Sequence, residues 1–441
     1  MKIIYLLLDA ISYEHSWLSN ENYMPNLKKI TENGINFHNH YSVTHNTRGN
    51  LASMLSGISS SLTKVMGRKQ SFRDNKYGNI QNRIREMGYT SNYFGSQPLF
   101  QNEKVGDNLD FDNCKYFSPS MSDFYIPAEK FNIKVREELN NIGKNSFSIF
   151  HYTDCHEPYE TPDNKLTKKE YPNIFKFHYR LSNILYRIPR QFFYNFFYPK
   201  NLKKKLDIFR KYPDLKNLCP NPFGSISTPE RYSSFYEMVW QNVEFQKEYE
   251  NMMFVSLRYL DKKITNIIEY IKLKYSKNSL IFISSDHGNN GVISPKTKKN
   301  EGCLTDDATH IPLTVMTFDE DLRNKLDIRG DVNNLTSHTN LYNTILNIVD
   351  PLNYKIQKSL LNKKEINKYV FSEINDSRLS YGECRMRGKN KEIIFKIDPS
   401  DNLDDIKLIE KKNIINDFLD EDYEKYYSIK ENFNNNLFER Y

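Results

Sequence analysis

The first half of the chain alternates short apolar runs with amphipathic segments, the pattern of strands that are each followed by a helix. Continuous apolar runs at 3–8 and 279–284 predict strands buried on both faces of a sheet. Further strands are expected at 89–94, 146–151 and 311–316, and helices at 24–33, 47–56, 77–87, 127–141, 234–274 and 339–349. This alternation predicts an α/β fold with a mostly parallel central sheet sandwiched by helices.

The end of the chain has a different pattern. Short strand-like segments separated by turn residues occur at 368–373, 382–387, 391–397 and 405–410, and an acidic helical segment follows at 413–436. They predict a small C-terminal antiparallel sheet with a helix packed against it. We therefore divide the chain into a catalytic core of residues 1–159 and 234–365, an insertion at 160–233 and a C-terminal subdomain at 366–441.

The insertion concentrates the positive charge of the chain. Residues 165–216 carry fourteen Lys or Arg and three acidic residues, a net charge of +11, whereas the whole chain of 441 residues carries +7. Tyr and Phe residues are interleaved with these cations. Such a surface suits contact with an anionic membrane or a phosphorylated glycan. The alternative is a helical lid whose aromatic residues form its own core. No nucleic-acid-binding motif accompanies the charge, so nucleic acid is not an expected partner.

The cysteines and the lack of targeting signals indicate a cytoplasmic protein. The five cysteines have no Cys-x-x-Cys spacing, and their odd number argues against a disulfide framework. The sequence contains neither a run of about 18 apolar residues nor a secretory signal. We expect a cytoplasmic location, with peripheral contact at the inner face of the membrane if the insertion binds lipid.

Two predicted central strands end in residues that can bind a metal ion. The run 3–8 is followed by Asp9, and the run ending at Ser285 is followed by Asp286-His287-Gly288. Ligands of open α/β sheets bind outside the carboxyl ends of the strands. Asp9, Asp286 and His287 are therefore candidate ligands of one metal ion. A set of two carboxylates and one imidazole does not identify which of the common divalent ions binds.

Thr47 is the candidate nucleophile. It precedes the apolar-periodic segment that ends at Gly57. A hydroxyl residue at this position is typical of a helix N-cap, and capping is compatible with catalysis. Backbone N–H groups and the helix dipole favour developing negative charge there, and contact with a metal ion would lower the pKa of the hydroxyl further.

Taken together, five short segments resemble, in the same order, those of the sulfatases of the alkaline phosphatase superfamily. They are the strand ending in Asp9, Tyr41–Thr47 leading into Leu51–Gly57, His156-Glu-Pro-Tyr159, Ser285-Asp-His-Gly288 and His310-Ile-Pro-Leu313. The resemblance covers nearly the whole chain and implies the sulfatase fold with its small C-terminal sheet.

The departures from the sulfatase pattern narrow the expected chemistry. Sulfatases carry a Cys or Ser that is converted to formylglycine, whereas this chain has Thr47, from which formylglycine cannot form. Sulfatases tend to pair acids after the first strand, whereas Asp9 is followed by Ala10. The set that remains, Asp9, Thr47, Asp286 and His287, is similar to the single-metal site of phosphoglycerol and phosphoethanolamine transferases such as lipoteichoic acid synthase. The resemblance implies a bound divalent metal, with Mn²⁺ or Mg²⁺ favoured and Zn²⁺ or Ca²⁺ as alternatives.

The resemblance also assigns roles around the metal. His156 and His310 match positions where the transferases place histidines around the phosphoryl group, and a histidine near a leaving oxygen is a natural general acid. Lys298 or Lys299 resembles the sulfatase lysine that holds the substrate oxyanion. Arg48 is a further candidate for binding the substrate.

These assignments predict a metal-dependent phospho-alcohol transferase or phosphodiesterase that works through a covalent intermediate on Thr47. The expected donor is a phosphorylated small molecule or lipid, and the expected acceptor is a glycan. One alternative is a sulfatase-like hydrolase of phosphate or sulfate esters. A second is a non-catalytic relative that binds a phosphorylated glycan.

Overall fold

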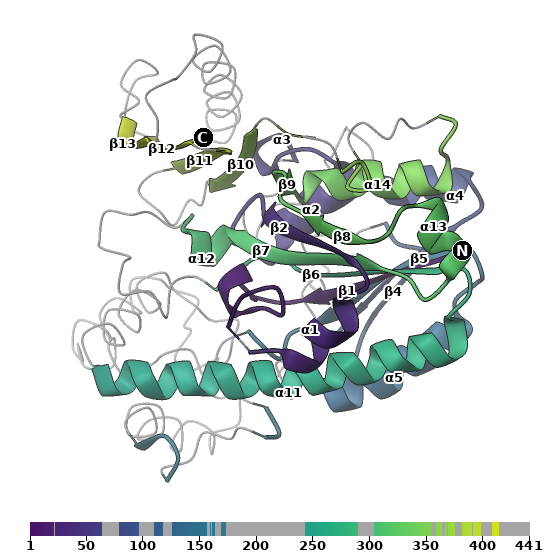
Figure 1. Cartoon of the computed structure of the whole chain (residues 1–441), viewed down its shortest axis with the longest axis horizontal. Helices are drawn as coiled ribbons and strands as arrows, with labels where there is room; N and C mark the ends of the chain where they lie inside the picture. The colour runs from purple at the N-terminus through teal and green to yellow at the C-terminus, as the bar shows by residue number, and fades with distance from the viewer. Residues whose placement is uncertain are drawn as a thin grey trace, which may run out of the picture.

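The computed structural model shows how these segments are arranged in space (Figure 1). It describes residues 1–21, 23–63, 79–96, 110–117, 126–156, 159, 161–163, 169–172, 243–289, 304–353, 359–363, 367, 369–374, 382–389, 391–397 and 408–413. Most of the basic insertion, Lys298, Lys299 and the expected helix at 413–436 lie outside these residues. The division of the chain into three parts therefore stays a prediction.

The core is a nine-stranded, mostly parallel sheet. Its strands run in the order β4-β3-β5-β1-β6-β7-β2-β8, and β9 pairs with β2. Among these pairs only β6 with β7 and β2 with β7 are antiparallel. The strand bounds are β1 Lys2–Leu8, β2 Ile35–Tyr41, β3 Thr90–Gly95, β4 Asn113–Tyr116, β5 Ser146–Tyr152, β6 Ser279–Ser285, β7 His310–Met316, β8 Gly330–Val332 and β9 Thr336–Ser337.

Helices cover both faces of the sheet, as the sequence predicts (Figure 1). On one face lie α1 (Pro25–Thr31), α5 (Ala128–Asn141) and α11 (Val243–Tyr275). On the other lie α2 (Thr47–Ser56), α4 (Ile80–Glu86) and α14 (Thr339–Val349). The short elements are η1 Tyr13–His15, α3 Ser60–Thr63, α12 Asp306–Thr309 and α13 Glu320–Lys325. Among the described residues no helix is both long and apolar enough to span a membrane.

Strand β1 has a buried row of side chains on each face. Ile4, Leu6 and Leu8 belong to the core cluster that includes α1, α5 and α11. The alternate residues Ile3 and Tyr5, together with Leu7, belong to the cluster that includes α2, α4 and α14. Successive side chains of a strand point to opposite faces, so a strand covered by helices on both sides must be apolar throughout. This is the physical reason for the continuous apolar run at the start of the chain.

Strand β2 was not predicted from the sequence. Its sequence, INFHNHY, has no clean period of two, and its pairing with β7 shifts in register between Phe37 and His40. Polar His and Asn side chains within the strand hide the alternation on which a prediction relies. The short strands β4, β8 and β9 were missed as well.

A separate four-stranded sheet follows the core, as expected from the sequence. Its order is β10-β11-β12-β13, antiparallel throughout, with bounds Tyr369–Ile374, Gly382–Gly388, Lys391–Ile397 and Leu408–Asn413. The last strand lies three residues later than predicted. The sheet is joined to the core where Glu373 N–H donates to the Val43 carbonyl at 2.7 Å and Ser372 Oγ donates to the Ser42 carbonyl at 2.7 Å.

Candidate active site

Asp9 and Asp286 meet because their strands are neighbours in the sheet. Strands β1 and β6 are parallel, and Leu8 pairs with Ser285, so the residue that follows each strand lies at the same edge. Both side chains are completely buried. The structure therefore brings together two of the residues predicted to bind metal.

The two carboxylates have few hydrogen-bond partners. Asp286 Oδ1 accepts from the N–H groups of Ala10 (3.1 Å) and His287 (2.8 Å). Asp286 Oδ2 and both oxygens of Asp9 have no hydrogen-bond partner among the described residues. Buried carboxylate oxygens without partners are costly unless a cation compensates their charge. This pair of carboxylates fits a bound metal ion.

His287 presents an unprotonated nitrogen to the carboxylates. Its Nδ1 lies 2.7 Å from the Gly288 carbonyl oxygen, which can only accept, so Nδ1 carries the proton in the neutral ring. The lone pair of Nε2 then faces Asp286 Oδ2 at 3.4 Å and Asp9 Oδ1 at 3.7 Å. A backbone carbonyl that holds the other ring nitrogen is the usual support of a histidine that binds metal.

Thr47 reaches this group from helix α2. It is the first residue of α2, is 8% exposed, and its Oγ1 lies 3.4 Å from His287 Nε2. The N-cap is Asn46, whose side chain accepts from Gly49 N–H at 2.9 Å. The cap alternative for Thr47 is therefore wrong. Its hydroxyl lies at the helix N-terminus, where a developing negative charge is favoured.

The loop before Thr47 is held by Asn50. The Asn50 side chain accepts from the N–H groups of Val43 and Thr44 and donates to the carbonyls of Thr44 and Asn46. It is fully buried one turn into α2. These four hydrogen bonds fix the loop that places the Thr47 hydroxyl beside His287.

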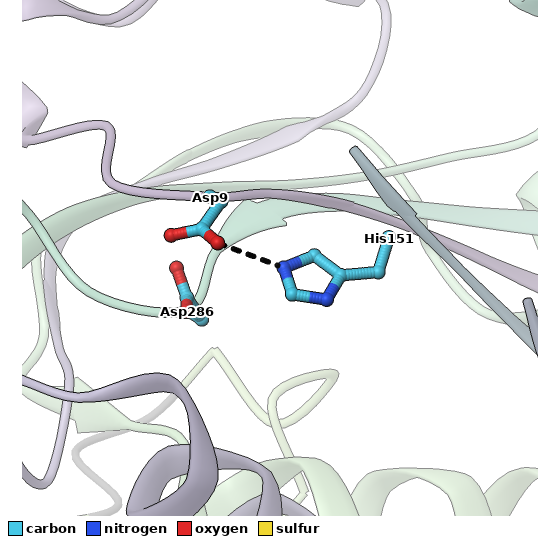
Figure 2. A group of neighbouring side chains, drawn as sticks. All are labelled: Asp9, His151 and Asp286. Carbon is cyan, nitrogen blue, oxygen red and sulfur yellow. Dashed lines mark ion pairs between the residues drawn. The ribbon is translucent and has the colours of Figure 1, made fainter. Parts of the chain in front are cut away.

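His151 is a site residue that the sequence analysis missed. It lies within β5, fully buried, and its Nε2 is 3.4 Å from Asp9 Oδ2 (Figure 2). Asp9, His151 and Asp286 offer atoms that all lie within 4.8 Å of one another. A signal was present, because Phe147 and Ile149 place His151 in an otherwise apolar row of the strand. A polar side chain at the end of such a row is a candidate ligand.

Histidines also set the ionisation of Asp9. Burial raises the pKa of the Asp9 carboxyl, whereas the positive charge of His156, His151 and His287 in their protonated forms outweighs burial and lowers the pKa to about 2. His156 makes the largest of these charge contributions and is half-buried in the bend after β5. A carboxyl group must be ionised to bind a metal ion, and positive charge near Asp9, from a histidine or a cation, favours that form.

His310 lies between two aromatic rings at the start of β7. Its ring stacks on Tyr13 at 4.3 Å and on Tyr41 at 4.8 Å between centroids. Its Nε2 donates to the His38 carbonyl at 2.7 Å, which leaves Nδ1 for proton transfer. Burial lowers the pKa of His310, although the His38 carbonyl and the Asp306 carboxylate act in the opposite direction. The general-acid role of His310 and of His156 stays a prediction.

The predicted substrate-binding residues receive less support from the geometry. Arg48 is half-buried at the second position of α2, beside Thr47. Lys298 and Lys299 lie outside the described residues, so their assignment stays a prediction.

Comparisons with known proteins identify the family of the chain and structures with a similar fold. Residues 2–351 match the protein-family model described as Sulfatase. The fold is similar to that of the phosphonate monoester hydrolase of Agrobacterium radiobacter, with a TM-score of 0.62 and 12% identity over 99% of this chain and 96% of that chain. It is also similar to BT4656 in complex with its substrate D-glucosamine-2-N,6-O-disulfate, with a TM-score of 0.60 and 13% identity over 99% and 98% of the two chains. At these identities the structures show the shared fold alone. No curated protein sequence matches the chain significantly.

Proposed function

Because the chain belongs to the sulfatase family, whose superfamily consists of hydrolases and transferases, we propose that it is a metal-dependent phospho-alcohol transferase or phosphodiesterase. The observation that carries this proposal is the position of Thr47 Oγ1, 3.4 Å from His287 Nε2, the atom that also faces the buried carboxylates of Asp9 and Asp286. A threonine is a secondary alcohol, so its oxidation would give a ketone and never the aldehyde of formylglycine. Thr47 is therefore better suited to attack the substrate with its own hydroxyl than to be converted to formylglycine.

The donor atoms of Asp9, Asp286, His287 and Thr47 fit one divalent cation. Three buried carboxylate oxygens without hydrogen-bond partners and one imidazole lone pair face one another there. A bound cation would supply charge neutralisation and lower the pKa of the Thr47 hydroxyl. Sulfatase-family enzymes use a metal, which supports this requirement.

The proposed reaction uses these side chains in two steps. Thr47 Oγ1, having released its proton to solvent, attacks phosphorus, and the bond from phosphorus to the leaving oxygen breaks. His156 or His310 donates a proton to that oxygen, and Thr47 is left as a phosphothreonine diester. In the second step an acceptor hydroxyl, or water, attacks phosphorus from the vacated side. The same histidine takes the acceptor proton, and Thr47 is released.

A phosphorylated small molecule or lipid as donor and a glycan as acceptor would suit this chemistry. The basic insertion supports the choice, because its cations would attract a phosphorylated ligand or an anionic membrane surface. A cytoplasmic location, with contact at the inner membrane face, is part of the same proposal.

The second candidate is a hydrolase of phosphate or sulfate esters. The family match favours it, since the model that matches is that of the sulfatases. The two candidates differ in the ester they cleave, and this difference can be measured directly.

The test compares matched aryl phosphodiester, phosphomonoester and sulfate ester substrates, with and without divalent metal. We expect the diester to be cleaved fastest, and Thr47→Ala to lose about 10³-fold or more of kcat. Thr47→Ser is the matched control, because it keeps a hydroxyl at the same position. Preference for the sulfate ester would favour the hydrolase, and full metal-dependent turnover by Thr47→Ala would exclude both candidates.

A further inference from the structure

His151 and His287 each lie near a different oxygen of Asp9. Asp9 directs Oδ2 toward His151 Nε2 at 3.4 Å and Oδ1 toward His287 Nε2 at 3.7 Å. Figure 2 shows the His151 ring pointing at the Asp9 carboxylate, with Asp286 beside both. His151 Nε2 is buried and has no hydrogen-bond partner among the described residues. An imidazole nitrogen and a carboxylate thus face each other without a hydrogen bond of good geometry.

The separation of these atoms is that of two ligands of one ion. Hydrogen bonds from N–H to oxygen span about 2.7 to 3.2 Å, shorter than the 3.4 Å between His151 Nε2 and Asp9 Oδ2. Two ligands bound tetrahedrally at about 2.1 Å lie about 3.4 Å apart. The pair formed by His287 Nε2 and Asp286 Oδ2 has the same separation, 3.4 Å.

Tyr93 holds the other nitrogen of His151. The Tyr93 hydroxyl oxygen lies 2.7 Å from His151 Nδ1 and can accept its proton, which leaves the Nε2 lone pair directed at Asp9. A histidine that binds metal almost always donates its second ring nitrogen to such a partner. Tyr93 and His151 lie on neighbouring strands, β3 and β5, so the sheet itself fixes this orientation.

We propose that His151 Nε2 is a further metal ligand, and that two imidazoles and two carboxylates bind a single cation. His151 and His287 would then hold the cation together with Asp9 and Asp286. This ligand set suits Zn²⁺ or Mn²⁺ better than Mg²⁺ or Ca²⁺, which prefer oxygen ligands. The inference rests on the proposed function, because it concerns the same site.

The experiment measures metal binding by the full chain without substrate. The chain is stripped with a chelator, and Zn²⁺ and Mg²⁺ are each titrated alone in competition with a chromophoric chelator. We expect one equivalent of Zn²⁺, bound more tightly than Mg²⁺, and a loss of more than about 100-fold in Zn²⁺ affinity in His151→Ala, because removing a direct ligand costs more than removing its support. His40→Ala is the matched control, since His40 is equally buried but contacts Thr336.

X-ray absorption of the zinc-loaded chain counts the imidazoles directly. We expect two in the unaltered chain and one in His151→Ala. If His151→Ala does not fold, His151→Gln preserves more of the side-chain volume and should show the same count. Tyr93→Phe should weaken Zn²⁺ binding by about 10- to 100-fold. Tyr152→Phe should not, because it removes a hydroxyl of β5 that donates to Asn132 on α5.

Each outcome bears on one proposal. Two imidazoles in the His151→Ala variant, an unchanged affinity, or two equivalents of Zn²⁺ in the unaltered chain would overturn the assignment of His151. If Thr47-dependent turnover persists in that case, the proposed function stands. Binding of Zn²⁺ through His151 without turnover of any ester would instead overturn the function and leave the ligand assignment intact.

Discussion

The backbone N–H of Ala10 donates to Asp286 Oδ1 at 3.1 Å, and Ala10 adopts a φ of 61° in this arrangement. The left-handed region is unfavourable for a residue with a side chain, and costs about 1 to 3 kcal/mol. Ala10 directly follows Asp9, so the strained residue links the two carboxylates of the site. Strain at this point is consistent with a backbone that is held for chemistry.

Two substitutions of Ala10 should show how much its left-handed backbone conformation affects the free energy of unfolding. Ala10→Val should lower the free energy of unfolding by about 2 kcal/mol or more, because a β-branched residue fits the left-handed region poorly. Ala10→Gly should stay within about 1 kcal/mol, because relief of strain offsets the larger entropy of the unfolded chain. Urea unfolding of the metal-free chain measures both. Equal effects of the two substitutions would argue against a strained Ala10.

Gly288 should tolerate no side chain. A Cβ at this position would lie 1.9 Å from the Asp307 carbonyl oxygen, a backbone atom that cannot turn away. Gly288→Ala should cost about 3 kcal/mol and displace the adjacent His287, with weaker metal binding as a result. Gly143→Ala is the control, because the nearest atom to its Cβ would be 4.0 Å away. Thermal unfolding and metal titration of both variants test this, and a neutral Gly288→Ala would contradict the close approach.

Asp154 should make the stability depend on pH. Burial raises the pKa of its carboxyl to about 7, against the opposing N–H group of Ala128, which donates to Oδ1 at 2.9 Å. The folded pKa exceeds the ordinary value of 3.8, so the folded chain binds more protons between these values. The contribution of Asp154 is therefore fully present below about pH 3.8 and is lost as pH rises through about 7.

Asp154→Asn removes this titration and keeps an oxygen that can accept from Ala128. The variant should exceed the unaltered chain in stability at pH 8 by about 4 kcal/mol, and the difference should shrink by about 1.4 kcal/mol for each pH unit below about 7. Urea unfolding at pH 8 and at pH 5 gives both numbers. A difference that does not change with pH would mean that Asp154 is not protonated near neutrality.

Arg387 should be needed for docking of the C-terminal sheet. Its buried guanidinium donates to Asp306 Oδ1 at 3.1 Å and to Thr309 Oγ1 at 2.7 Å, both on α12. Arg387→Met would remove the donor to the buried Thr309 hydroxyl and Leu304 carbonyl and should cost about 2 to 3 kcal/mol. Arg329→Met, which breaks only an exposed pair with Asp327, should cost less than about 1 kcal/mol. Chemical unfolding and limited proteolysis compare the two, and similar losses would refute the docking role.

The elements that the sequence predicted well are those buried on both faces or strongly amphipathic. Strands β1 and β6 needed only their continuous apolar runs, and α2 was predicted with its observed bounds, Thr47–Ser56. Strand β2 was not predicted, since its His and Asn residues break the period that a single sequence can reveal. Long-range pairing, and not local propensity, makes that segment a strand.

The difference between local pattern and long-range pairing also explains which residues of the candidate site could be predicted. Asp9, Asp286 and His287 directly follow predicted strands, so their position at the sheet edge could be inferred. His151 lies inside a strand, and it reaches Asp9 only because β5 is the neighbour of β1, with Leu7 paired to His151. The order of strands in a sheet depends on packing across the whole molecule, which the local pattern does not contain.

One face of β1 leads to a residue of the candidate site, whereas the other carries only core residues. Asp9 continues the row of Ile3, Tyr5 and Leu7, whereas Ile4, Leu6 and Leu8 pack on the side of α11. In evolutionary terms, a lineage could exchange the side chains of the α11 face among apolar residues of similar volume without altering the reacting groups. The α2 face has no such freedom near its end. Descendants of this chain should therefore diverge unevenly, with one side of the sheet drifting while the other retains its residues.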